Sequence, residues 1–194
     1  MSSTLTPIWC DTLVRFQRTS IRETGHRPVC WLRTPMEEQL LLPGCQRPGC
    51  SFWQPVPWPG DKAPLGRKTG RFHASIVEYL SMCQFLEMRF CLPVASGGTV
   101  LSFLHHRVFE TLPNTRFHPP GRALEEAFLY QREHPSLPLA YCMAATCDEY
   151  EPLLLMLRAS DGQAFVQRAQ GGATLDLKIG LDRLLPRLQF VYDI

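Results

Sequence analysis

Cysteine and histidine carry the most versatile chemistry in this sequence, which contains eight cysteines and six histidines. Four residues separate Cys45 from Cys50, a spacing close to that of paired zinc ligands. Cys142 and Cys147 have the same spacing, but they lie in or beside an apolar run that predicts a buried strand. We therefore predict structural thiols at these positions and no metal site.

A cysteine thiolate beside a histidine would instead provide a nucleophile and a base for covalent catalysis. Cys10, Cys45 and Cys50 are candidate nucleophiles, and His73 and His118 are candidate bases. Such pairs must meet in space, and no recognisable nucleophile motif surrounds any of the three cysteines. We therefore expect no enzymatic activity and no cofactor.

Carboxylates gather in one short segment that contains Asp148, Glu149 and Glu151. This acidic break separates two continuous apolar runs, residues 139–146 and 153–157. Runs of this length, bounded by breakers, are typical of strands that are buried on both faces. These residues alone predict a globular α/β domain with an acidic loop.

The two apolar runs form the predicted centre of a β-sheet. A third strand, residues 164–168, follows Ser160, Asp161 and Gly162, where the Asp-Gly pair accepts the positive φ of a tight hairpin. Three further strands are predicted at residues 40–42, 88–92 and 100–104.

Four segments have the apolar spacing of helices. The first begins at Thr6, a candidate N-cap, and places Trp9, Leu13 and Phe16 on one face. Its polar face mixes acidic and basic residues, so we expect it to pack on the core rather than lie in a membrane interface. The other helices are predicted at residues 72–85, 123–132 and 175–188.

An aromatic and proline-rich segment, residues 52–60, lies between the first two predicted helices. Its alternating prolines cannot donate to a sheet ladder, which favours an extended or edge segment. Such a segment could serve as a ligand for a proline-recognising domain. We predict instead an extended stretch whose two tryptophans, Trp53 and Trp58, pack on the core.

Together these elements predict an α/β (mixed α+β) fold, with a single central mixed β-sheet of about six strands flanked by helices. A length of 194 residues and a hydrophobic content of 45% suit one domain over residues 1–194. The net charge of +2 argues against a nucleic-acid partner. Because Met1 opens no signal peptide and no apolar run approaches the ~20 residues of a membrane-spanning helix, we expect a cytoplasmic protein.

Four short motifs follow one another along the chain. They are Phe52-Trp53-Gln54-Pro55, His73-Ala74-Ser75-Ile76 with Tyr79, Leu137-Pro138 before the central strand and its acidic loop, and Ser160-Asp161-Gly162 before the leucine-rich C-terminal segment. In this order and spacing, over about residues 9–188, the chain resembles the Syd family of SecY-interacting proteins. That family is similar in fold to the wider SUKH superfamily of α/β binding proteins.

The resemblance implies a small cytoplasmic protein, held loosely at the cytoplasmic side of the bacterial inner membrane by binding SecY, where it regulates or quality-controls the translocase. We expect a monomer. The resemblance also implies an acidic concave surface that meets basic cytoplasmic loops of SecY. The residues that match this surface are Glu78, Glu87, Asp148, Glu149 and Glu151. The alternative, implied by the wider superfamily, is an immunity-type protein that binds and neutralises a toxin.

Two features depart from the family's pattern. Between residues 102 and 132 the family carries a tryptophan, an Asp-Phe pair, and an asparagine and a histidine in the following helix, none of which this chain matches. The net charge is slightly positive, whereas a protein with an acidic groove is usually acidic. Either the acidic residues are concentrated on one face, or the partner has changed.

Overall fold

The computed structural model describes residues 5–31, 38–45, 50–58, 63–92, 107–115, 117–146, 152–170 and 174–192. The helices are α1 (Leu5–Thr24), α2 (Ala74–Met82), α3 (Pro120–Glu133) and α4 (Leu181–Leu184), with the 3-10 helices η1 (Glu38–Leu40), η3 (Thr69–Arg71) and η5 (Leu185–Arg187). The strands are β1 (Val29–Trp31), β2 (Leu41–Leu42), β3 (Cys50–Trp53), β4 (Arg89–Cys91), β5 (Val108–Thr111), β6 (Ala140–Thr146), β7 (Leu153–Arg158), β8 (Ala164–Arg168), β9 (Thr174–Asp176) and β10 (Gln189–Phe190).

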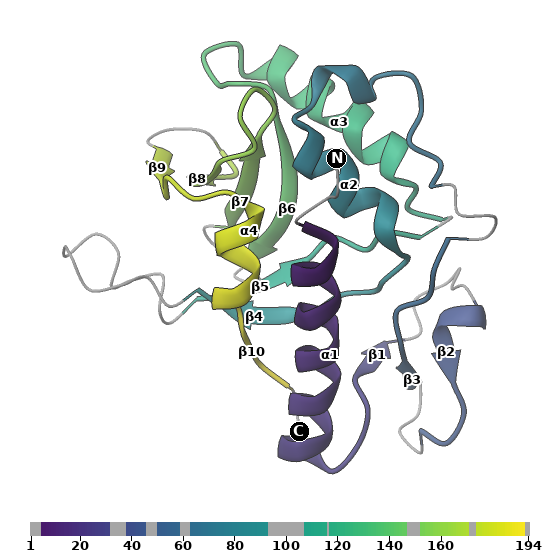
Figure 1. Cartoon of the computed structure of the whole chain (residues 1–194). Helices are drawn as coiled ribbons and strands as arrows, with labels where there is room; N and C mark the ends of the chain where they lie inside the picture. Colours follow the sequence, from purple (N-terminus) through teal and green to yellow (C-terminus); the bar gives the residue numbers. More distant parts are fainter. Residues whose placement is uncertain are drawn as a thin grey trace.

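Within these ranges, seven strands form the main sheet in the order β10-β4-β5-β6-β7-β8-β9. The predicted central sheet flanked by helices is confirmed, and β6 is its middle strand (Figure 1). The pairing is antiparallel throughout rather than mixed. The connections between β6, β7 and β8 are too short for a parallel crossover, so these strands can only pair as antiparallel neighbours.

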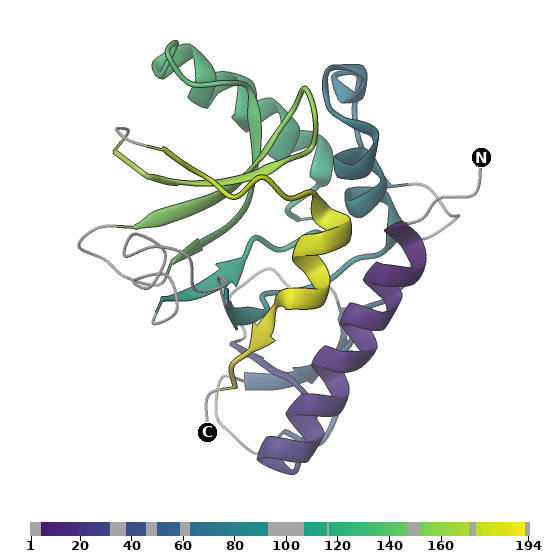
Figure 2. The same ribbon diagram turned by 60° about the vertical axis from the view of Figure 1, so that its left-hand side comes forward.

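Alternate side chains of the central strands face two hydrophobic clusters. In β7, Leu155 and Leu157 belong to the main core, whereas Met156 joins a smaller cluster with Ala140 and Phe165. This two-residue alternation follows from the pleat of a strand, and it confirms burial on both faces. Figure 2 shows α3 on one side of these strands and α4 on the other.

Helix α1 supplies two of the largest side chains of the main core. Trp9 and Phe16 are buried, as their helical spacing predicts, and Leu13 is partly buried beside them. The Trp9 ring packs against the rings of Tyr79 and Phe85, with centroid distances of 4.7 and 5.4 Å. Helices α1 and α2 are therefore joined through aromatic contacts.

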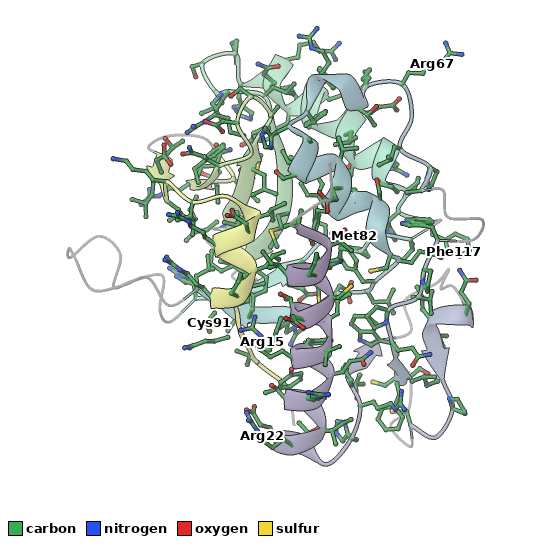
Figure 3. All side chains as sticks on the ribbon, in the orientation of Figure 1. Arg15, Arg22, Arg67, Met82, Cys91 and Phe117 are labelled. Carbon is green, nitrogen blue, oxygen red and sulfur yellow. The ribbon has the colours of Figure 1, made fainter. Side chains whose placement is uncertain are left out.

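Polar side chains of α1 also fasten it to its neighbours. Because α1 begins at Leu5, Thr6 lies inside the helix and is not its N-cap, and its hydroxyl donates to a carboxylate oxygen of Glu78 at 2.9 Å. The guanidinium of Arg15 donates to the carbonyl oxygens of Leu185 and Pro186 at 2.7 and 2.5 Å. Figure 3 shows Arg15 on α1 beside the C-terminal helix.

The aromatic segment contributes to a second, smaller sheet that the sequence did not predict. Strand β3 lies between β1 and β2 and is antiparallel to both. Trp53 and Trp58 are 0% and 3% exposed, and the Trp58 indole N–H donates to the Leu80 carbonyl oxygen at 3.3 Å. The predicted packing of both tryptophans is therefore confirmed.

The predicted helix over residues 175–188 is wrong in its first half. Thr174–Asp176 pairs with β8 as strand β9, and the α-helix is limited to Leu181–Leu184. Lys178 has a φ of 53°, a left-handed conformation that interrupts a helix, and Pro186 ends the α-helical pattern in the turn η5. The leucine spacing nevertheless predicted burial, because Leu181, Leu184, Leu185 and Leu188 are buried.

The two remaining predicted helices are confirmed with shifted ends, as α2 and α3. The predicted strand over residues 100–104 lies outside the described residues, and the structure adds β5, which the sequence did not predict. In the described ranges, no helix is both long enough and apolar enough to cross a membrane.

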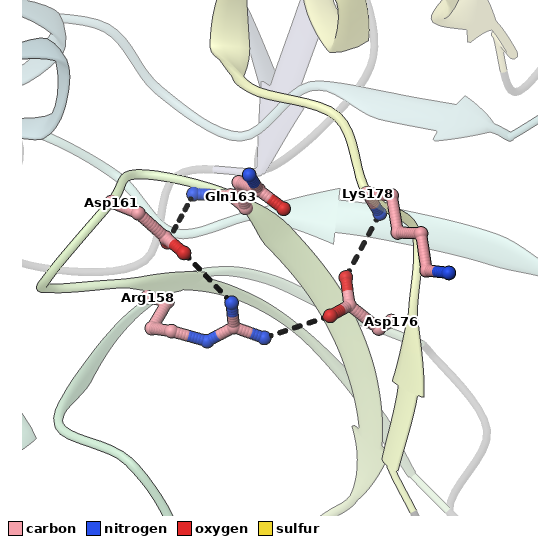
Figure 4. A network of polar contacts seen from close by, with 5 residues as sticks. All are labelled: Arg158, Asp161, Gln163, Asp176 and Lys178. Carbon is pink, nitrogen blue, oxygen red and sulfur yellow. Dashed lines mark hydrogen bonds and ion pairs between the residues drawn. The ribbon is translucent and has the colours of Figure 1, made fainter.

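A polar network joins the last three strands of the main sheet (Figure 4). Arg158 donates to Asp161 at 2.8 Å and to Asp176 at 3.0 Å. The backbone N–H groups of Gln163 and Lys178 donate to the same two carboxylates. The Lys178 N–H and the Arg158 guanidinium lower the pKa of Asp176. Burial alone would raise the pKa of Asp161, but the Gln163 N–H and Arg158 outweigh it and lower that pKa too.

The predicted hairpin turn after β7 is confirmed, with Gly162 at a φ of +70°. A Cβ atom at Gly162 would lie 2.7 Å from both His73 Nδ1 and Ser75 Oγ. Only glycine therefore fits here, both for its backbone conformation and for its close approach to the start of α2.

Candidate functional site

The structure describes two of the five acidic residues that the resemblance implies for partner binding. Glu78 lies on α2, partly buried, and accepts the hydrogen bond from Thr6. Glu87 lies between α2 and β4 and is also partly buried. Asp148, Glu149 and Glu151 lie outside the described residues.

A groove of about 290 Å³ lies between α3 and the sheet face that carries the smaller hydrophobic cluster. We call it the α3 groove. Its lining residues are Leu112, Ala123, Glu126, Ala127, Leu129, Tyr130, Glu133, Ala140, Cys142, Leu154 and Met156. Glu126 and Glu133 are the charged residues in this set, and neither Glu78 nor Glu87 belongs to it.

One side of α3 forms the wall of the groove. Ala123, Glu126, Tyr130 and Glu133 follow one another at three- and four-residue steps, which place their side chains on the same side of a helix. Leu124, one position further round, is fully buried in the main core instead. The helix therefore serves the core with one face and the groove with another.

The floor of the groove comes from β6 and β7. Ala140 and Cys142 lie on β6, and Leu154 and Met156 lie on β7, with Cys142 directly opposite Met156. All four are even-numbered positions, so the strand pleat turns them toward α3 and away from the main core. Because Ala140 and Cys142 are small, space remains between this floor and the helix.

Tyr130 anchors α3 to the sheet at the groove. Its hydroxyl oxygen accepts a hydrogen bond from Gln167 Nε2 at 2.7 Å, and its O–H donates to the Ala169 carbonyl oxygen at 3.3 Å. Gln167 lies on β8 and is 2% exposed, and its Oε1 has no hydrogen-bond partner among the described residues. The wall of the groove is thus held at a fixed distance from its floor.

The charge of the groove resides in its two carboxylates. Burial raises the pKa of the Cys142 thiol to about 12, and burial also raises the pKa of the Tyr130 phenol, so both groups are neutral at pH 7. Glu126 accepts a hydrogen bond from Arg122 at 2.9 Å, but both side chains are exposed, so this pair is weak. The result is an apolar floor beneath a negative rim.

The cysteine–histidine pairing considered as an alternative in the sequence analysis finds no support in the hydrogen bonds of His73. Its Nδ1 accepts from the Ser75 backbone N–H at 3.3 Å and contacts Ser75 Oγ at 2.8 Å, which makes it the N-cap of α2. The candidate cysteines are exposed (Cys10), partly buried (Cys45) and buried (Cys50). In the part of the chain that the structure describes, no three His, Cys, Asp or Glu side chains gather as metal ligands would.

Sequence reasoning missed Glu126 and Glu133. It identified the helix from the spacing of the apolar residues that face the core. That spacing does not tell which residues of the sheet lie beside the other side of the helix. A signal was available in the stripe that combines the small residue Ala123 with Glu126, Tyr130 and Glu133 at helical steps. A stripe of this composition indicates a side of the helix that is neither buried in the core nor fully exposed to solvent.

Comparison with models of known protein families gives no match, and comparison with curated proteins gives none either. The resemblance to the Syd family therefore rests on the four sequence motifs, and the function is argued from those motifs and from the groove.

Proposed function

We propose that this protein is a non-enzymatic binding protein that recognises SecY at the cytoplasmic side of the bacterial inner membrane and regulates or quality-controls the translocase. The observation that carries the proposal is the α3 groove, an apolar depression whose charged lining residues are Glu126 and Glu133. Such a surface suits a basic loop that also carries apolar side chains. The order of the four sequence motifs supports SecY as the partner.

The two parts of the groove make different contributions to binding. Leu129 and Leu112 are 49% and 36% exposed, and covering them would contribute about 1 kcal/mol each, since full burial of a leucine is worth about 1.5–3 kcal/mol. The carboxylates attract basic loops and raise the association rate more than the final affinity. Binding should therefore weaken as salt screens the rim.

The acidic loop predicted from the sequence extends this proposal. Strand β6 ends at Thr146 and β7 begins at Leu153, so the segment with Asp148, Glu149 and Glu151 connects the two strands of the groove floor. Its part in binding is tested separately, by replacing Asp148 and Glu149 together with lysine.

The proposal is tested by pull-down of tagged protein from detergent-solubilised inner membranes. We expect SecY to be recovered at low salt and lost at about 1 M salt, where the Debye length falls to about 3 Å. Enrichment of a different protein, without SecY, would refute SecY as the partner and favour the immunity-type alternative.

Charge-reversal variants then locate the binding surface. Glu126→Lys with Glu133→Lys should abolish recovery of SecY at low salt, because it converts the rim from negative to positive. Glu125→Lys is the matched control for Glu126→Lys alone, since Glu125 is an exposed carboxylate on the same helix but does not line the groove. Equal loss in both variants would refute a specific role for the groove.

A further inference from the structure

The two carboxylates of the α3 groove have a spacing that restricts what can pair with both. Glu126 and Glu133 are seven residues apart on one helix. Seven residues correspond to a rise of about 10.5 Å and return the side chain to within about 20° of the same line. The rim therefore presents two negative groups, about two turns apart, along one side of an apolar floor.

Small residues next to this pair leave room for a second backbone. Ala123 and Ala127 line the groove on the same helix, and Ala140 lies on the floor below. Ala127 and Ala140 are buried, so it is the partly exposed Ala123 that allows a second helix to approach α3 within the usual interaxial distance of about 8–10 Å. Leu129, 49% exposed, is available to cover the apolar side of such a neighbour.

We infer that the α3 groove receives an amphipathic helix of the partner protein. It lies along α3, with two cationic side chains seven positions apart facing Glu126 and Glu133, and with apolar side chains between them on the floor. This inference rests on the proposed function, because it describes the segment of the partner that the groove binds. It is the helix-in-groove mode of recognition.

An extended peptide does not match the same spacing. Side chains on one face of a strand recur every two residues, at about 6.7 Å and then at about 13.4 Å. Neither spacing equals the rise of about 10.5 Å along α3 between Glu126 and Glu133, whereas positions i and i+7 of a helix reproduce it. The volume of about 290 Å³ lies at the lower limit of ligand pockets, about 300–1,000 Å³, and suits a few side chains of a larger partner.

A second copy of this chain is a poorer occupant. Arg15 and Arg22 of α1 are seven residues apart, but the Arg15 guanidinium is bonded to the carbonyl oxygens of Leu185 and Pro186. Figure 3 shows both arginines on α1, with Arg15 beside the C-terminal segment. The Arg15 guanidinium is held by two backbone carbonyl oxygens, whereas the pair of Glu126 with Arg122 is exposed and weak, so Glu126 is available to a partner and Arg15 is not.

The test uses three synthetic peptides of about 18 residues and identical composition, long enough to form a helix. The first has lysines at positions i and i+7 with leucines at i+3 and i+4. The second moves one lysine to the opposite helix face, and the third carries a central proline in place of a terminal one. Fluorescence anisotropy of labelled peptide gives each dissociation constant, and circular dichroism confirms that every protein variant is folded.

We expect the first peptide to bind at least tenfold more tightly than the other two. Glu126→Lys with Glu133→Lys should remove this preference. A peptide with glutamates in place of the two lysines should then bind the double variant more tightly than the first peptide does. Leu129→Gln, at an exposed position, should weaken the first peptide severalfold without unfolding the protein. Equal binding of the three peptides, or no binding of any, would overturn the inference.

The same variants separate this inference from the proposed function. If recovery of SecY depends on Glu126 and Glu133 but the three peptides bind equally well, the helical mode of binding is overturned and SecY binding is left in place. Selective peptide binding without recovery of SecY would refute the proposed partner and support the groove as a helix-binding site. Concentration-dependent dimers in sedimentation velocity that the double variant abolishes would assign the groove to a second copy and overturn the inference.

Discussion

The hydroxyl of Tyr130 is the polar contact through which α3 holds its distance from the sheet, and its removal is a direct test of the structure. Tyr130→Phe keeps the ring but deletes the acceptor for Gln167 Nε2 and the donor to the Ala169 carbonyl oxygen. The perturbation leaves Gln167 on β8 with no partner for either end of its amide, since its Oε1 already has none among the described residues.

The expected cost follows from the burial of that amide. Gln167 is 2% exposed, so water does not replace the lost hydrogen bond. A buried polar group left without a partner costs about 1–3 kcal/mol, and we expect Tyr130→Phe to lower the free energy of unfolding by about 2 kcal/mol. For a protein of this size, that corresponds to a decrease in melting temperature of about 4–8 °C.

A double-mutant cycle distinguishes the loss of the hydrogen bond to the buried Gln167 amide from a general loss of packing. Gln167→Leu removes the buried amide, so adding it to Tyr130→Phe should recover most of the lost stability and give an interaction energy of about 1–2 kcal/mol. Urea unfolding followed by tryptophan fluorescence measures all four proteins, with the slope m checked for constancy. Additive effects, within about 0.5 kcal/mol, would refute the proposed coupling between α3 and β8.

Two further predictions concern the hairpin between β7 and β8. Gly162→Ala should lower the free energy of unfolding by about 2–3 kcal/mol, because its φ is +70° and a Cβ would lie 2.7 Å from His73 Nδ1; an unchanged urea midpoint would contradict the close approach. Since the pKa values of Asp161 and Asp176 are lowered in the folded state, their ion pairs with Arg158 stabilise it above the unfolded pKa of about 3.9, and this stability is lost as the pH falls through the lowered values. These carboxylates are 38% and 39% exposed, so Arg158→Gln should lower the free energy of unfolding by only about 1 kcal/mol at pH 7 and by less at pH 2. A loss of stability that is larger at pH 2 than at pH 7 would contradict the lowered pKa values of the two carboxylates.

The parts of the fold that were predicted from the sequence are those with an unbroken local period. Trp9 and Phe16 recur at the period of a helix, and the runs that became β6 and β7 are almost entirely apolar. The segment that became β8 begins with three apolar residues after the turn. The same reasoning failed at residues 175–180, where Leu175 lies in a strand and Leu177, four residues before Leu181, lies in an irregular turn. There the segment pairs with the edge of β8 and forms β9. The spacing of residues within the segment does not predict pairing with a strand elsewhere in the chain.

The sequence by itself determined the α/β class, the central strands, the aromatic anchors and the Asp-Gly turn, because these depend on the order of residues within one element. Only the tertiary structure decided the α3 groove. Its wall comes from Glu126 and Glu133 on α3, and its floor from even-numbered residues of β6 and β7 such as Cys142 and Met156. The spacing of residues within one element does not tell which helix face will lie over which face of a strand pair. Here the placement of α3 on β6 and β7 is set by the packing of Leu124 in the main core and by the hydrogen bond between Tyr130 and Gln167.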